Sequence, residues 1–169
     1  MRTNIAFHRT TAENAAKILA EGLKCFASRG LTLPDSDAPN FWESFDALKA
    51  AGFKFTGQLD MTREVMNMVP AEECARLVRS ASWDARSRTE SVFVRRGGVH
   101  TTWAEDGETI AIDLDKVAEM GLDWTSDNFG SDGDLQVFGD IPASAVLGIV
   151  CDEWMKGHGF TVSVDGWGF

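Results

Sequence analysis

The chain has three histidines, and their spacing excludes several familiar reactions. No HExxH or other paired-histidine spacing is present, so zinc hydrolysis has little support and no metal is expected. The glycine-rich phosphate loop and the GxSxG serine elbow are also absent. His8 is the strongest single candidate for chemistry, because we expect it to end a strand immediately before a capped helix, beside the polar Arg9 and Thr10. A histidine that hydrogen-bonds its own turn is an equally weighted interpretation of His8.

Arginines form the second group of chemical interest. Six of them fall within residues 76–96, namely Arg76, Arg79, Arg86, Arg88, Arg95 and Arg96. Such a window is often only a solvated surface. It also suits a phosphate-bearing ligand, because the arginine fork binds anions in a bidentate manner.

The elements expected around His8 follow from local signals. Residues 3–8 read as a short strand, and Thr10 with Glu13 forms a capping box that starts a helix. Apolar residues then recur at helical spacing, and Gly22 lies where a left-handed residue closes a helix. The opening is therefore predicted to be strand, tight turn and helix.

The middle of the chain is predicted to be a helical insertion over residues 30–90. Residues 30–40 are rich in turn formers, and a helix is expected over Phe41–Ala50. A short strand at 53–57 and a helix over 60–68 follow. Pro70 suits the first position of another helix, with Glu72 and Glu73 in its first turn. This insertion is expected to recognise a target or to cover the site.

From residue 91 onward the pattern changes to strands. We expect strands over 91–96 and 99–103, joined at Gly97-Gly98, and further strands over 108–114, 135–139, 145–151 and 160–164. A short helix over 116–120 and a polar loop over 122–133 complete this part. The predicted fold class is α+β, in which an N-terminal strand and helix and the helical insertion precede a mainly antiparallel sheet.

Composition limits the class of protein. The chain has 169 residues, 44% of them hydrophobic and 25% charged, which suits one globular domain over 1–169. No apolar run approaches the ~20 residues that span a bilayer, and the N-terminus lacks the apolar stretch of a signal peptide. Three cysteines without CxxC spacing indicate neither a zinc site nor a disulfide framework. We therefore expect a cytoplasmic protein with no membrane partner.

The net charge of −10 is unevenly distributed. Residues 1–96 hold 14 Lys/Arg and 12 Asp/Glu, whereas residues 97–169 hold 2 and 14. The acidic C-terminal part repels nucleic acid. A protein partner is therefore favoured over a nucleic acid.

Three stretches resemble the ADP-ribosyltransferase family. Residues 7–23 (FHRTTAENAAKILAEGL) are similar to the family's opening strand and the helix that follows it. Residues 98–102 (GVHTT) resemble its middle strand, and residues 135–142 (LQVFGDIP) with 145–149 resemble a late strand. The three stretches occur in the family's order.

The resemblance implies a single-domain protein that binds NAD⁺ as co-substrate, splits off nicotinamide and passes ADP-ribose to an acceptor. In the family's His-Tyr-Glu variety, the histidine binds the adenosine ribose, the tyrosine stacks on nicotinamide, and the glutamate holds the nicotinamide ribose. By position, His8 and Thr10 match the first motif, His100 matches the tyrosine, and Asp134 matches the glutamate. Breaking the N-glycosidic bond builds positive charge on the ribose, which a carboxylate stabilises.

The resemblance therefore predicts His8 and Asp134 as catalytic residues. The residues predicted to bind NAD⁺ are His8, Arg9, Thr10, Arg96, His100, Thr102 and Trp103. From proximity in sequence, Arg9, Arg95 or Arg96 is expected to contact its pyrophosphate. The acceptor is expected to be a protein, a nucleic acid or a small molecule.

The sequence departs from the family pattern at several of these positions. The chain has no tyrosine, so any stacking must come from His100, Trp103 or Phe129, and Asp134 is one methylene shorter than glutamate. Arg9 replaces a small glycine. Structural roles also fit, with Asp134 capping a turn and His100 facing solvent. The alternative function is a catalytically degenerate acidic protein of the same fold, a binding protein or inhibitor of phage or mobile-element type.

Overall fold

The structure is a computed structural model, and it describes residues 4–35, 37–53, 68–96, 107–126, 134–159, 162–163 and 166–167. The chain divides into two compact units, one comprising Met1–Lys24 with Val92–Phe169 and the other Cys25–Ser91. The bounds of the second unit lie close to those expected for the helical insertion. The organisation of the whole chain as one domain stays a prediction.

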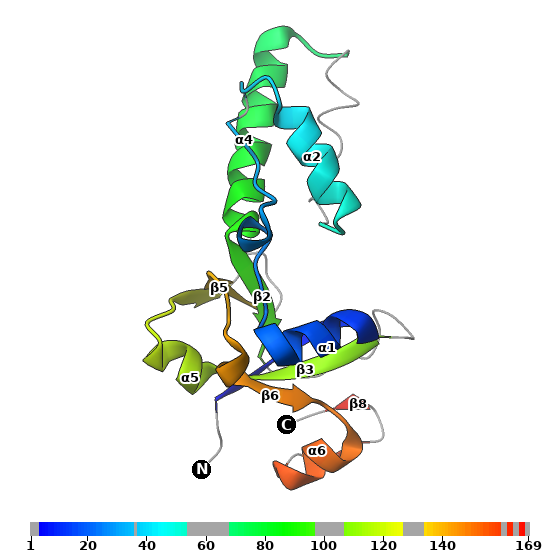
Figure 1. Cartoon of the computed structure of the whole chain (residues 1–169). Helices are drawn as coiled ribbons and strands as arrows, with labels where there is room; N and C mark the ends of the chain where they lie inside the picture. The colour runs from blue at the N-terminus through cyan, green and yellow to red at the C-terminus, as the bar shows by residue number, and fades with distance from the viewer. Residues whose placement is uncertain are drawn as a thin grey trace. The chain divides into compact units, whose positions relative to one another are not determined.

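Among the described residues, six strands form the main sheet, in the order β4-β5-β2-β1-β3-β6 (Figure 1). Their bounds are β1 Ile5–Thr11, β2 Ser91–Arg95, β3 Gly107–Asp113, β4 Trp124–Ser126, β5 Asp134–Phe138 and β6 Val146–Ile149. The pairs β1–β2, β1–β3, β3–β6 and β4–β5 are antiparallel. The α+β class with a mainly antiparallel sheet is thus confirmed.

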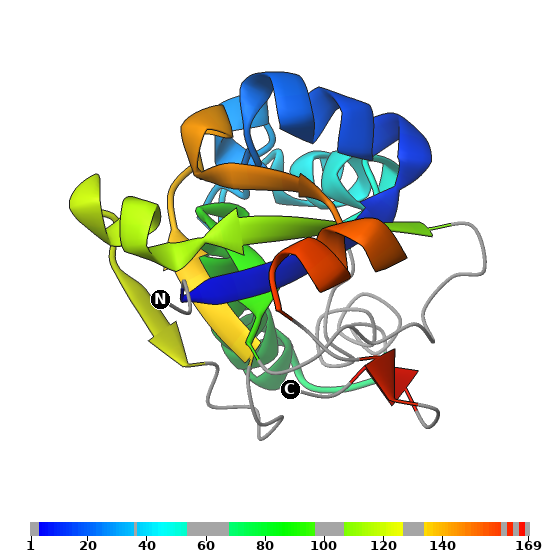
Figure 2. The same ribbon diagram turned by 90° about the horizontal axis from the view of Figure 1, so that it is seen from below.

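Helices α1 (Ala12–Glu21) and α6 (Asp152–Gly157) lie on opposite faces of this sheet (Figure 1). Figure 2 shows α6 in front of the sheet, with α1 behind its upper edge. On the α6 face, Ile5 and Phe7 of β1 and Ala111 of β3 form a buried cluster against which Trp154 packs. Side chains alternate along a strand, so Ala6, His8 and Thr10 belong to the face on which α1 lies.

β1 is longer than predicted, since it runs through His8 to Thr11. All seven of its residues pair with β3, from Ile5 opposite Asp113 to Thr11 opposite Gly107. The capping residue is correspondingly Thr11 rather than the predicted Thr10, and its hydroxyl accepts from the Asn14 amide at 3.3 Å. The capping-box assignment was wrong by one residue because β1 continues through Thr10 to Thr11, so the helix begins one residue later than predicted.

The helix end was predicted correctly. Gly22 closes α1 with φ +86°, and its amide donates to the Ile18 carbonyl at 2.9 Å. Leu23 then pairs with Ile141 in an isolated antiparallel bridge. This contact ties the end of α1 to the segment that follows β5.

The second unit is helical in its described part and has a core of its own. Its elements are the 3₁₀ turn η1 (Ala27–Arg29), α2 (Phe41–Ala50) and α4 (Ala71–Thr89). The buried core residues are Leu33, Phe41, Phe45, Leu48, Phe53 and Val78. α2 has the predicted bounds, and α4 continues well beyond its predicted apolar stripe. Pro70 is the N-cap of α4 rather than its first residue, and the helix expected over 60–68 lies outside the described residues but for its last position.

The C-terminal elements correct four further predictions. β4 forms within the predicted loop over 122–133, where it pairs with β5. The strand over 145–151 stops at Ile149, because Cys151 caps α6, a helix with no sequence signal. Val162–Ser163 (β7) pairs with Gly166–Trp167 (β8) in a separate two-stranded sheet and does not join the main sheet. The predicted short helix is α5, which begins earlier, at Leu114, and ends at Glu119.

Candidate functional site

His8 lies in the middle of a central strand, where it faces Ile110 of β3 across the antiparallel ladder. The sequence placed it at the end of a strand beside a turn, and that prediction was wrong. The interpretation of His8 as a ring bound to its own turn was also wrong, because its hydrogen-bond partner lies 85 residues away in sequence. Its position is therefore set by the sheet.

The imidazole of His8 bridges β1 and β2. Among the described residues, the register between these strands is given by the pair Phe7–Arg95, whereas β1 and β3 pair over all seven residues of β1. Beyond that pair, His8 Nδ1 lies 2.9 Å from the Phe93 carbonyl oxygen, to which it donates. Because a carbonyl only accepts, this bond requires the proton on Nδ1 and leaves Nε2 as an acceptor.

Burial favours the neutral form of this imidazole. Desolvation by burial lowers the pKa of His8 below its ordinary value of 6.5, and the bond to the Phe93 carbonyl only partly opposes that shift. A neutral imidazole with its Nδ1–H engaged is suited to accept a hydrogen bond from a hydroxyl at Nε2. It is unsuited to bind an anion.

Arg9 leaves β1 on the face opposite His8, since consecutive strand residues alternate. Its guanidinium donates to the buried Thr109 hydroxyl at 3.2 Å. A Cβ placed at Gly107 would lie 2.7 Å from Arg9 Nε, so Gly107 leaves the room in which this side chain lies. The structure does not bring Arg9 to the face that carries His8, whereas Thr10 shares that face.

Arg96 follows β2 and is engaged at the beginning of β1, where its guanidinium donates to the Asn4 side-chain oxygen at 2.7 Å. Two other arginines of the predicted basic window form ion pairs. Arg76 pairs with Glu73 at 2.6 Å, and Arg86 pairs with Asp35 at 2.7 Å. These contacts favour a structural role for this part of the window over phosphate binding.

Asp134 is the first residue of β5, and only its backbone position is described. The strand order places β5 beside β2, so one strand separates Asp134's strand from that of His8. The predicted residues His100, Thr102 and Trp103 lie outside the described residues. β1, which carries His8, and β5, which begins at Asp134, thus belong to the same sheet. The predicted site as a whole extends beyond the described residues.

Two polar groups next to the predicted residues were missed. The Phe93 carbonyl orients His8, and the Thr109 hydroxyl holds Arg9. A backbone carbonyl has no sequence signal. The placement of Thr109 among apolar residues in the strand over 108–114 was the available clue to a buried hydroxyl.

No protein-family model and no curated protein matches the chain. Among the described residues, no group of three or more His, Cys, Asp and Glu is arranged to hold a metal ion. Within the same residues, no helix is both long and apolar enough to cross a membrane.

Proposed function

We propose that the chain is an NAD⁺-dependent mono-ADP-ribosyltransferase-like protein in which His8 binds a ribose hydroxyl of NAD⁺. The observation that carries the proposal is the fixed tautomer of His8. Its Nδ1–H is committed to Phe93, which leaves a neutral Nε2 acceptor on a central strand. The resemblance of residues 7–23 assigns the ribose-binding histidine to this same position.

The remaining roles follow from chemistry. As the N-glycosidic bond of NAD⁺ breaks, the bonding electron pair leaves with nicotinamide and positive charge develops on the ribose. The carboxylate of Asp134 is proposed to stabilise that charge. An acceptor nucleophile then bonds to the anomeric carbon and loses its proton. Thr10 is proposed to add a hydroxyl on the His8 face, and an aromatic ring among residues 100–103 to stack on nicotinamide.

The first test is nicotinamide release from NAD⁺, followed by chromatography, together with the mass of acceptor proteins. We expect a gain of one ADP-ribosyl group per modified site. Asp134→Asn is expected to lower kcat by at least about tenfold, because removal of one such electrostatic contact costs a few kcal/mol. His8→Gln is expected to raise KM. No nicotinamide release by wild type at high enzyme concentration would contradict catalysis.

The alternative is an acidic binding protein of the same class without catalysis. The uneven charge favours it, because residues 97–169 hold only 2 basic residues against 14 acidic ones. In that case, the wild-type chain binds a basic protein and Asp134→Asn leaves this binding unchanged. The nicotinamide assay separates the two functions, since only the enzyme cleaves NAD⁺.

A further inference from the structure

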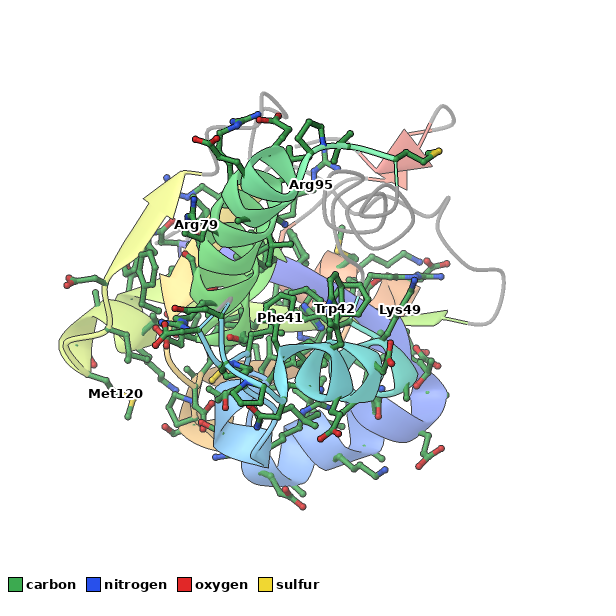
Figure 3. The ribbon with its side chains drawn as sticks, turned by 90° about the horizontal axis from the view of Figure 1, so that it is seen from above. Phe41, Trp42, Lys49, Arg79, Arg95 and Met120 are labelled. Atoms are coloured by element: carbon green, nitrogen blue, oxygen red, sulfur yellow. The ribbon has the colours of Figure 1, made fainter. Side chains whose placement is uncertain are left out.

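A small apolar surface is exposed where α5 and β5 end. Met120, at the C-cap of α5, is 53% exposed, and Phe138, the last residue of β5, is 41% exposed. Figure 3 shows Met120 at the margin of its unit, with its side chain directed away from the ribbon. Single exposed apolar residues need no explanation, but neighbouring ones indicate an interaction site.

Backbone contacts bring these two residues to one corner of the sheet. Gly121 turns the chain with φ +74°, and the Leu122 amide returns to the Val117 carbonyl at 3.3 Å. The Phe138 amide donates to the Asp123 carbonyl at 3.0 Å. A Cβ at Gly139 would lie 3.5 Å from Leu122 Cδ2. Residues 122–123 and 138–139 therefore lie side by side, with Phe138 in this contact and Met120 two residues before it.

Carboxylates border this corner. Glu119 and Asp123 are exposed, and within the part of the chain that the structure describes neither carboxylate has an ion pair. Two lysines close in sequence to these segments have other partners, since Lys116 donates to the Ser144 carbonyl at 3.1 Å and Lys24 pairs with Asp140 at 3.3 Å. We call Glu119, Met120, Leu122, Asp123 and Phe138 the α5–β5 patch.

We propose that the α5–β5 patch docks a basic segment of a partner protein. An apolar side chain of that segment contacts Met120 and Phe138, and its Lys or Arg residues face Glu119 and Asp123. Charge decides the kind of occupant. A second copy of this acidic chain, with net charge −10, meets like-charge repulsion, whereas a basic segment gains electrostatic complementarity. The proposal is independent of NAD⁺ binding.

The test uses the whole chain and a synthetic amphipathic peptide of Lys and Leu. Two peptides of equal length serve as comparisons, one of Lys and Gly and one of Glu and Leu. Amide chemical shifts are followed by NMR. We expect saturable shifts concentrated at residues 119–123 and 137–139 with the Lys/Leu peptide, weaker binding with Lys/Gly, and none with Glu/Leu.

Variants of the α5–β5 patch separate the contribution of its apolar side chains to peptide binding from that of its carboxylates. The double variant Met120→Ser with Phe138→Ser is expected to weaken Lys/Leu binding at least about fivefold, and the exposed-site control Leu19→Ser to leave it unchanged. Glu119→Gln with Asp123→Asn alters only exposed groups and is expected to reduce the salt dependence of binding. Shifts spread over all acidic segments, equal binding of Lys/Gly, or unchanged affinity in both double variants would overturn the proposal. Concentration-dependent dimers formed through the patch would do so too.

Discussion

His8 and Arg9 are neighbours in sequence, but their side chains leave β1 on opposite faces. The resemblance assigned both to one ligand, and nothing in a short motif reveals which residues share a face until strand bounds and register are known. The identity of His8 as a candidate was visible from the sequence. Its lowered pKa and its Nδ1 donor were not, because the first depends on burial in the folded chain and the second on a carbonyl 85 residues away.

The pH dependence of stability tests the state of His8. Its pKa in the folded protein lies below the ordinary 6.5, so at pH above this value both folded and unfolded forms carry a neutral ring. As pH falls below 6.5, the unfolded chain binds the proton more readily, and the free energy of unfolding falls until the folded-state pKa is reached. We expect His8→Gln to show a shallower loss of stability between pH 6.5 and 5.

Urea unfolding at several pH values measures the slope of the free energy of unfolding against pH. His158→Gln serves as the matched control, because His158 is exposed and stacks on Trp154 at 3.9 Å. The control should keep the wild-type slope. An unchanged slope in His8→Gln would show that His8 titrates normally in the folded chain.

At the scale of elements, local signals predicted helices at the positions of α1, α2, α4 and α5, with the observed end for α1 and both observed bounds for α2. Phe41–Ala50 was predicted with its observed bounds, and Gly22 was predicted as the end of α1. Failures occurred where tertiary pairing decided the outcome. β1 runs through polar Thr10 because β3 pairs with it, β4 exists only as the partner of β5, and α6 is too short to give a periodic pattern.

The cap of α1 gives a direct test of the corrected boundary. Thr11→Ala removes the hydroxyl that accepts from the Asn14 amide, so we expect a loss of about 1 kcal/mol in the free energy of unfolding. Thr10→Ala is the neighbouring control and should cost clearly less. Denaturant melts compare the two, and a larger loss from Thr10→Ala would restore the original capping-box assignment.

Gly22 is expected to tolerate no side chain. It adopts φ +86° and ψ 177°, a conformation used almost only by glycine, and an added Cβ would collide with the Ile141 carbonyl and come within 2.8 Å of the Ala143 amide. Gly22→Ala should therefore cost more than about 2 kcal/mol. Gly30→Ala is the control, because Gly30 also has a positive φ but nothing lies within 4 Å of its added Cβ. Thermal or denaturant melts in which both variants lose the same stability would show that the collision is relieved.

At the scale of the whole molecule, the main features are the uneven charge and the division of the chain into two compact units. The sequence located the change of composition near residues 30 and 90, because an extended helical segment interrupts the strands. The sequence alone did not predict that the second unit has a hydrophobic core of its own. In the structure, the second unit has its own aromatic core around Phe45, which contacts Trp42 edge-on at 5.4 Å.

Because the second unit has its own core, we expect a substitution in that core to reduce the protection of backbone amides from hydrogen exchange in that unit alone. Phe45→Ala should remove about 3–5 kcal/mol of packing free energy from the second unit. We expect faster amide hydrogen exchange in α2 and α4, with β1 and β3 little changed. Ala16→Gly, on the exposed side of α1, is a mild control that should alter only α1. Equal loss of protection in both units after Phe45→Ala would show that the chain unfolds as one cooperative body.

The central claim, that His8 binds NAD⁺, is tested most directly by calorimetric titration of NAD⁺ into wild type, His8→Ala and His158→Ala, each checked by circular dichroism to be folded. The account predicts saturable binding in wild type and His158→Ala. It predicts binding at least about tenfold weaker in folded His8→Ala, equivalent to about 1.4 kcal/mol. No binding by wild type, or equal affinity in all three proteins, would contradict it.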